Sequence, residues 1–407
     1  MDLNRIDATA AGMNAERLAR IGEHIEQRYI APGKIPGALT AVLRRGAVAY
    51  LHVAGERDRE RKLPLTSDTV FRIYSMTKPL TSIALMTLWE RGHFTLDDPV
   101  HRFIPSWEGL EVRTVGKWPS FETRTAHRPM RIRDLLTHQS GLTYDFMYAT
   151  EIDKAYRELQ LGRAQKGYTL ADMVEQLATL PLEFSPGERW NYSIATDVVG
   201  HLIERISGQN LADFLRRVIF EPLGMHDTVF SPRDDQLQRF ASCYTRDGQK
   251  RLVLQDDAQA SQFVGRSFLS GGGGLLSTAK DYLRFCQMLL GGGALGQTRI
   301  IGRKTLELMT ANHLPGSVDL ASVAMAGFSE THYQGVGFGL GFASKIDPVA
   351  NGYPASRGSY YWGGMASTLF WVDPTEDLAV VFMTQLIPSS TFNFRGQLEA
   401  LVYAALD

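Results

Sequence analysis

The chain has 407 residues, 44% of them hydrophobic, and carries 43 Lys and Arg against 44 Asp and Glu, a formal net charge of −1. This balance excludes the strong basic field that attracts nucleic acid or an acidic membrane, and no apolar run approaches the roughly 20 residues that span a bilayer. We therefore expect a globular protein of two lobes whose partner is a small molecule, with neither nucleic acid nor membrane as a partner; the sequence carries no signal for the oligomeric state.

The first predicted elements are a helix and a pair of strands. Residues 14–31 place their apolar side chains on one face at helical spacing. Two apolar runs follow at residues 38–43 and 47–53, and the glycine-containing turn between them predicts a β-hairpin. The alternating charges of residues 56–62 indicate a solvated connection, and residues 70–74 lead in an extended conformation into Ser75.

The middle of the chain is mainly helical, and strands return at the end. From residue 79 to about residue 208 helical patterns dominate, and the segment after residue 79 is apolar enough to be buried. Further helices are predicted at residues 132–136, 170–180, 196–206 and 212–219. Strands are then predicted at residues 336–343, 367–372 and 378–384, with a turn at residues 373–377 and a closing helix at residues 392–405.

Strands at both ends of the chain predict the fold class. The simplest packing joins them into one mainly antiparallel sheet, covered by the first and last helices, with a helical lobe inserted between them. We therefore expect an α+β fold, in which an α/β sandwich carries an inserted, mostly helical domain. Residues 1–78 and 270–407 would form the α/β domain and residues 79–269 the helical domain, with the active site at their interface.

The N-terminal segment and the cysteines predict a location. Residues 1–7 lack the basic patch and the apolar stretch of a secretory signal. The two cysteines are Cys243 and Cys286, and the apolar helical pattern around Cys286 indicates a buried thiol. A reducing cytoplasm fits these features.

Ser75 and Lys78 form a Ser-x-x-Lys pattern where the extended run turns into a helix. Residues i and i+3 share a helix face, so the amine lies beside the hydroxyl and can help to remove its proton. A helix N-terminus adds partial positive charge where an oxyanion would develop. This arrangement favours acyl transfer.

The chain matches the same short pattern a second time, at Ser277 and Lys280. There, Thr278 and Asp281 form a capping box ahead of an apolar run, so the start of a helix explains the segment. Ser277 is therefore assigned a structural role. Ser75 has no Glu or Gln at capping distance, and Pro79 follows Lys78 directly.

Two further motifs lie downstream. Tyr192 precedes Ser193 and Ile194 in a loop before a helix, and a neighbouring ammonium such as that of Lys78 would lower the pKa of its phenol toward use as a base. Trp362, Gly363 and Gly364 precede a strand, and paired glycines let the backbone approach a substrate closely enough for an N–H to donate to an oxyanion. Neither motif is specific alone, because a packed aromatic or a glycine bulge would also explain it.

The order of these motifs resembles that of the serine β-lactamase and penicillin-binding superfamily, in its class C-like branch, and most closely the family VIII carboxylesterases. The resemblance extends from residue 70 to about residue 385 and includes residues 135–142, 272–279 and 371–374, which look like structural signposts of the superfamily. It implies the β-lactamase/transpeptidase-like fold and an acyl-enzyme mechanism without a metal or organic cofactor.

Carried over to this sequence, the resemblance assigns roles to individual residues. Ser75 would be the acylated nucleophile and Lys78 the amine that shares its proton. Tyr192 would be the partner base, which relays a proton to the leaving alcohol and then activates water. The backbone N–H groups of Ser75 and Met365 would form the oxyanion hole. The remaining assignments are substrate-binding residues: Trp362, Gly363, Gly364 and Tyr144.

Two departures from the antibiotic-degrading branch predict the substrate. Ile194 stands where an Asn amide usually holds an acylamino side chain, and Trp362 stands where Lys or His usually faces the β-lactam carboxylate. The predicted function is therefore a serine carboxylesterase for small or short-chain esters. The alternatives are a β-lactamase or D-Ala-D-Ala-type peptidase and an acyltransferase, while the presence of Ser75, Lys78 and Tyr192 argues against a non-catalytic binding protein.

Other chemistries lack their motifs. The chain has no Gly-x-Ser-x-Gly, no His-Glu-x-x-His and no Gly-Lys-Ser/Thr after the glycine run at residues 271–274. Two distant cysteines cannot supply a zinc cluster. His138 is interpreted as a packed or hydrogen-bonded histidine rather than a catalytic one.

Overall fold

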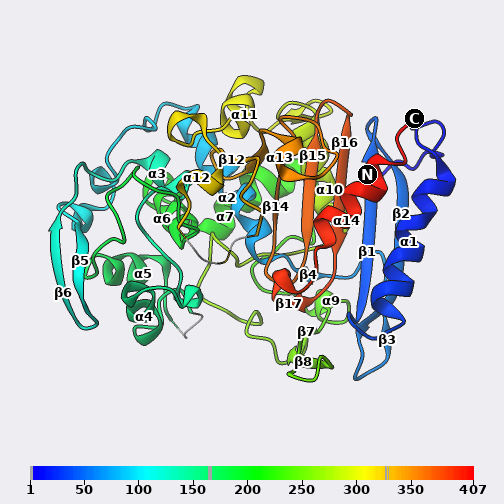
Figure 1. Cartoon of the computed structure of the whole chain (residues 1–407), viewed down its shortest axis with the longest axis horizontal. Coiled ribbons are helices and arrows are strands. Elements are labelled where there is room, and N and C mark those ends of the chain that lie inside the picture. The colour runs from blue at the N-terminus through cyan, green and yellow to red at the C-terminus, as the bar shows by residue number, and fades with distance from the viewer. Residues whose placement is uncertain (1–2, 164–166, 326–327, 329) are drawn as a thin grey trace.

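The main sheet takes its strands from both ends of the chain (Figure 1). A computed structural model describes residues 3–163, 167–325, 328 and 330–407, and within them the sheet has eight antiparallel strands in the order β12-β13-β14-β15-β16-β1-β2-β3. The strands are β1 Gly37–Arg44, β2 Ala47–Asp58, β3 Leu63–Pro64, β12 Val336–Phe338, β13 Ala343–Lys345, β14 Tyr360–Gly363, β15 Leu369–Asp373 and β16 Leu378–Met383. The predicted α+β fold with one antiparallel sheet is confirmed.

Helices cover both faces of this sheet. The first and last helices, α1 (Ala15–Ile25) and α14 (Phe394–Tyr403), pack against each other on one face, and α10 (Ala279–Leu290) lies behind β15, β16 and β1 (Figure 1). Every residue of β1 is buried as a result. A strand covered on both faces reads as a continuous apolar run, which is why residues 38–43 show no alternation.

The second lobe is built around α2 (Thr77–Trp89), which begins at the Ser75 turn and is buried along nearly its whole length. Helix α6 (Ala195–Ser207) packs directly against it. The other helices of the lobe are α3 Ile132–Leu136, α4 Glu151–Glu158, α5 Leu170–Leu177 and α7 Leu211–Leu215, followed by the short turns α8 Glu221–Leu223 and α9 Asp234–Leu237. Among the described residues, no helix is both long and apolar enough to cross a membrane.

Several shorter strands and helices complete the fold. Strand β4 (Phe71–Arg72) pairs with β9 (Leu276–Ser277), which fixes the segment just before Ser75. The remaining elements are the strands β5 Glu111–Lys117, β6 Ser120–Thr125, β7 Cys243–Arg246, β8 Leu252–Asp256, β10 Ala294–Leu295, β11 Thr298–Arg299 and β17 Leu386–Ile387, and the helices α11 Arg303–Thr310, α12 Leu320–Val323 and α13 Pro348–Asn351.

Three segments differ from the sequence predictions. The single strand expected at residues 336–343 is wrong, because the chain turns back at Gly341 (φ +95°) to form the two antiparallel strands β12 and β13. The charged run at residues 56–62 is not wholly a solvated connection, since β2 continues to Asp58, whose buried carboxylate accepts hydrogen bonds from Arg61 and Ser242. The hairpin β5–β6 was not predicted, because most of its side chains are exposed and give no apolar alternation.

Candidate active site

Ser75 lies in a single 3₁₀ turn, Tyr74–Met76, that leads into α2. Its side chain is almost buried, and its Oγ accepts hydrogen bonds from Tyr192 Oη at 2.6 Å and from Lys78 Nζ at 3.2 Å. Tyr74, the residue before it, has φ +41°, a left-handed conformation that is strained for a residue with a side chain. The β4–β9 pairing and the packing of the Tyr74 ring on Phe263 hold this strained turn in place.

Lys78 is buried beneath the nucleophile, as the helix spacing predicts. Its Nζ donates to the Gly272 carbonyl at 2.6 Å as well as to Ser75, and it lies 4.7 Å from the centre of the Tyr192 ring. Burial lowers the pKa of Lys78 to about 8, while the carboxylates of Asp197 and Glu330 act in the opposite direction. A substantial fraction of the amine is therefore neutral at weakly alkaline pH and can accept a proton.

Tyr192 reaches Ser75 from the loop before α6, and it is enclosed by other rings. The ring centres of His138, Tyr144 and Trp362 lie 5.1, 5.2 and 5.4 Å from that of Tyr192. The expected lowering of the Tyr192 pKa is wrong, because burial raises this pKa well above 10, and Glu330 adds to the rise. In the free protein Tyr192 is a neutral phenol that donates its hydrogen bond to Ser75.

The turn after β14 approaches the nucleophile from the sheet. A Cβ at Gly364 would lie 2.3 Å from the carbonyl oxygen of Ile73, so only glycine fits this contact. The Gly364 N–H closes the turn on Thr368 O, whereas the Met365 N–H makes no hydrogen bond within the described part of the chain. The Ser75 N–H belongs to the first turn of a helix, where N–H groups have no intrahelical acceptor. Both N–H groups predicted for the oxyanion hole are thus available to a substrate.

A cavity of about 490 Å³ opens at Ser75. Its wall includes Tyr74, Tyr144, Phe146, Ile194, Asp197, Phe263, Arg266, Gly272 and Met365. Tyr144 and Met365 therefore lie where the sequence places them. Trp362 is fully buried and packs on Tyr192 instead of lining this cavity.

Gly363 lines a different cavity, of about 290 Å³, together with Glu330 and Arg395. A Cβ at Gly363 would lie 3.3 Å from the Arg395 guanidinium. The predicted site residues thus divide into a group at the nucleophile (Ser75, Lys78, Tyr192, Tyr144, Met365), a supporting pair (Trp362, Gly364) and Gly363 in the neighbouring cavity.

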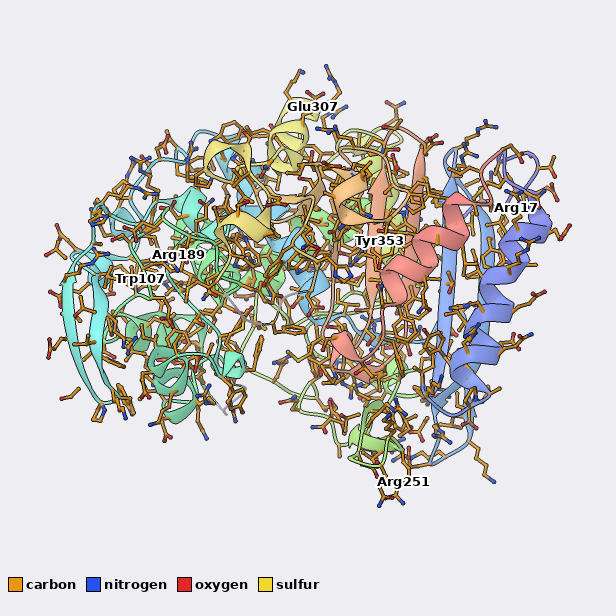
Figure 2. All side chains as sticks on the ribbon, viewed as in Figure 1. Arg17, Trp107, Arg189, Arg251, Glu307 and Tyr353 are labelled. Carbon is orange, nitrogen blue, oxygen red and sulfur yellow. The ribbon has the colours of Figure 1, made fainter. Side chains whose placement is uncertain are left out.

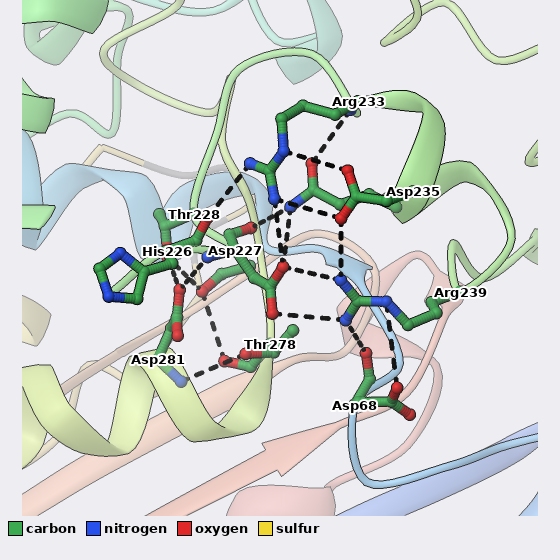
Figure 3. Close-up of polar contacts among 11 residues, drawn as sticks. Asp68, His226, Asp227, Thr228, Arg233, Asp235, Arg239, Thr278 and Asp281 are labelled. Carbon is green, nitrogen blue, oxygen red and sulfur yellow. Dashed lines mark hydrogen bonds and ion pairs between the residues drawn. The ribbon is translucent and has the colours of Figure 1, made fainter. Parts of the chain in front are cut away.

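The second Ser-x-x-Lys segment has the structural role assigned to it. Ser277 Oγ lies 2.9 Å from Thr228 Oγ1, and the Thr278 side chain accepts from the Asp281 N–H at the start of α10. Figure 3 shows Thr228, Thr278 and Asp281 joined to the charged cluster around Asp227. The side chain of Lys280 is exposed, so no amine is buried beside this serine as Lys78 is beside Ser75.

Two buried carboxyl groups near Lys78 were missed by sequence reasoning. Asp197, in the first turn of α6, accepts hydrogen bonds from Ser270 Oγ at 2.5 Å and from the Gly272 N–H at 3.1 Å. Glu330 is half-buried as a residue, with its carboxyl Oε1 shielded from solvent, and desolvation raises the pKa of this carboxyl to about 7. No short motif could have found them, because Asp197 in a first helical turn would usually indicate a helix cap and Glu330 lies in an irregular segment.

The buried histidine His138 has the packing role predicted for it. Its Nδ1 lies 3.1 Å from Ser193 Oγ, and burial holds its pKa well below 6.5, so the ring is neutral.

Among the described residues, no group of three or more His, Cys, Asp or Glu side chains is placed to hold a metal ion. The side chains that hydrogen-bond to Ser75 Oγ are an amine and a phenol, and such a hydroxyl–amine–phenol arrangement can support acyl transfer through a serine.

The chain is similar in sequence and in fold to known proteins. A family model described as Beta-lactamase matches residues 23–404. Esterase EstB of Burkholderia gladioli is 32% identical over 404 residues, which cover 93% of this chain and 93% of EstB. The structure is similar to that of "EstCE1, a hydrolase with promiscuous acyltransferase activity" (TM-score 0.79, 26% identity, 96% of this chain and 98% of the other). It is equally similar to unliganded simvastatin synthase (LovD) from Aspergillus terreus (TM-score 0.79, 26% identity, 95% and 97%).

Proposed function

The chain belongs to the beta-lactamase family and is a serine hydrolase of its ester-cleaving branch, and we propose that it is a carboxylesterase for small or short-chain esters that works through an acyl-enzyme on Ser75. The observation that carries the proposal is the position of Ser75 Oγ, within hydrogen-bonding distance of both Lys78 Nζ and Tyr192 Oη at the mouth of a cavity. Lys78 and Tyr192 are the proposed proton-transfer groups.

The proposed acylation begins with attack of Ser75 Oγ on the ester carbonyl carbon. The hydroxyl proton passes to the neutral amine of Lys78, and the backbone N–H groups of Ser75 and Met365 hold the oxyanion. The C–O bond to the alcohol then breaks, and Tyr192 gives its proton to the leaving oxygen while it is reprotonated from Lys78. Attack of water on the acyl-enzyme reverses these transfers and releases the acid.

The proposal predicts a preference for esters over penicillins. The kcat/KM for a short-chain nitrophenyl ester should exceed that for benzylpenicillin by at least about 100-fold, because Ile194 in the cavity wall lacks an amide and the buried Trp362 supplies no cation for the β-lactam carboxylate. Steady-state kinetics with both substrates measures the ratio. Ile194→Asn should lower the ratio of kcat/KM for the ester to kcat/KM for penicillin, because it places an amide in the cavity. A kcat/KM for penicillin that equals or exceeds the ester value would contradict the assignment.

The pKa of Lys78 predicts the pH dependence of acylation. The productive form needs the neutral amine, so kcat/KM should rise about tenfold per pH unit below the Lys78 pKa and level off near pH 8. The measurement is a pH–rate profile corrected for spontaneous ester hydrolysis. Glu330, with a pKa of about 7, titrates in the same range. Glu330→Gln should keep the rising limb, whereas a flat profile from pH 6 to 8 in the wild type would remove Lys78 from the role of base.

A transferase activity is the second candidate, and the names of two structural neighbours favour it. EstCE1 is described as having promiscuous acyltransferase activity, and LovD is named as a synthase. The same acyl-enzyme serves both reactions, and only the acceptor differs. The two are separated by adding a primary alcohol to the ester assay and measuring the new ester against the free acid.

The proposal includes a cytoplasmic location and a small ester as the partner. Cys243 and Cys286 are both buried, and neither forms a disulfide. Unbridged cysteines are the usual state in a reducing compartment. Fractionation of cells that produce the protein tests the location.

A further inference from the structure

Arg266 lies in the wall of the Ser75 cavity and lacks a carboxylate partner among the described residues. Its buried Nε makes no hydrogen bond, and its Nη1 reaches only the Gly274 carbonyl, at 3.5 Å. The guanidinium lies over the ring of Phe263, with 4.3 Å between its central carbon and the ring centre. A shielded guanidinium with unused donors is costly unless a ligand completes its hydrogen bonds.

The other charges of the cavity have partners. Arg163 forms an ion pair with Asp145 at 3.1 Å. Asp197 accepts from Ser270 and from the Gly272 N–H, and it also faces the amine of Lys78. Arg266 stays protonated despite its burial, because a guanidinium loses its proton only at very high pH. The carboxylates of Asp197 and Asp256 act on the Arg266 guanidinium electrostatically, but among the described residues no hydrogen bond or ion pair joins it to either of them, so its donors remain open to a ligand.

The position of Ile194 identifies the part of a substrate that enters this cavity. Ile194 lines it, at the position where an antibiotic-degrading relative would hold the acylamino side chain, which belongs to the acyl group. Gly363, at the end of β14, lines the separate smaller cavity instead. An acyl chain on Ser75 that enters this cavity past Ile194 would thus have Arg266 within the same cavity wall.

We propose that Arg266 binds an acidic group at the far end of the acyl chain, so that the preferred substrates are monoesters of short dicarboxylic acids. This inference rests on the proposed esterase function and names its substrate class. A carboxylate would form charge-assisted hydrogen bonds with the free guanidinium donors, and the planar group can hold it in a bidentate manner. A cavity of about 490 Å³ has room for such a chain.

The test compares pairs of methyl esters with equal numbers of acyl carbons. Monomethyl succinate, glutarate and adipate are measured against methyl butanoate, pentanoate and hexanoate by methanol release. In the wild type, the best monoester should exceed its neutral partner by about tenfold or more in kcat/KM, mainly through a lower KM. Arg266→Met should lower this ratio by about tenfold, and Arg266→Lys, which keeps the charge, should restore part of it.

The control removes the same charge far from the cavity. Arg251 points outward at the edge of the molecule (Figure 2), where it pairs with Asp247, and its side chain is 71% exposed. Arg251→Met should leave the ratio unchanged. Thermal unfolding of each variant shows whether it is folded. If Arg266→Met does not fold, the wild-type ratio of kcat/KM for the monoester to kcat/KM for its neutral partner still shows which ester is preferred.

Each outcome separates this inference from the proposed function. A wild-type enzyme that hydrolyses the neutral esters equally well or better, or an Arg266→Met ratio equal to that of the wild type, would overturn the role of Arg266 and leave the esterase in place. Failure to hydrolyse any of the six esters, together with full activity of Ser75→Ala on nitrophenyl esters, would instead reject the proposed function.

Discussion

Replacing Ser75 by alanine is expected to lower kcat/KM for a short-chain nitrophenyl ester by at least about 1,000-fold. The change removes the only oxygen that lies between Lys78 Nζ and Tyr192 Oη, and no other described hydroxyl has that position. The fold should survive, because Ser75 Oγ makes hydrogen bonds only within the site. Steady-state kinetics and a thermal unfolding curve measure the two effects separately.

The chain supplies the matched control in its second Ser-x-x-Lys segment. Ser277→Ala removes a buried hydroxyl that contacts Thr228, so it should cost some stability, of order 1 kcal/mol, and leave the kinetics nearly intact. An organophosphonate should add one mass label to the wild-type protein, and peptide mapping should place it on Ser75. A label on Ser277, or full activity in Ser75→Ala, would show that the wrong serine was chosen.

Replacing Tyr192 by phenylalanine is expected to lower kcat by about 100- to 1,000-fold, the usual contribution of a positioned proton-transfer group. The ring and its contacts with His138 and Trp362 remain, and only the 2.6 Å hydrogen bond to Ser75 is lost. The loss should appear in kcat, since in the proposed mechanism the phenol acts on the leaving oxygen and not in binding. Single-turnover and steady-state rates with the same ester measure it.

Tyr282 is the control for the loss of a buried phenol. It is also fully buried, and its hydroxyl donates to the Met76 carbonyl at 2.9 Å, behind the nucleophile turn. Tyr282→Phe removes the same atom without touching Ser75 Oγ, so kcat should change less than about threefold. Equal losses in the two variants would assign Tyr192 a packing role, and an unchanged kcat in Tyr192→Phe would have the same meaning.

Local signals allowed parts of the fold to be predicted well. The helix at residues 132–136 was bounded correctly, and the capping pattern at Thr278 marks the start of α10 as expected. The apolar runs at both ends of the chain indicated a shared sheet, and β1 does pair with β16. The exposed hairpin β5–β6 could not be found this way, because neither face of it is buried enough to leave an apolar pattern.

Sequence reasoning predicted which residues meet at the site, but not the pKa values that their burial produces. The spacing of Ser75 and Lys78 predicted their proximity correctly, because the 3₁₀ turn that carries Ser75 continues directly into α2, which carries Lys78. The pKa of Tyr192 was predicted in the wrong direction, since the neighbouring amine was inferred but the burial of both groups was not. Asp197, Glu330 and Arg266 come from segments far apart in the chain, and only the folded structure brings them to the nucleophile.

The pairing of β1 with β16 also has a consequence for folding during synthesis, because it decides how much of the chain must emerge before the active site can form. The two strands are neighbours in the sheet but lie more than 300 residues apart in the sequence. The eight-stranded sheet therefore cannot be complete until β16 has left the ribosome. Ser75 and Lys78 emerge early, yet Met365 reaches them only when β14 and β15 have joined the closed sheet. A nascent chain that has not yet exposed β16 therefore lacks the Met365 N–H of the proposed oxyanion hole, and its hydrolytic activity should appear only after β16 has emerged.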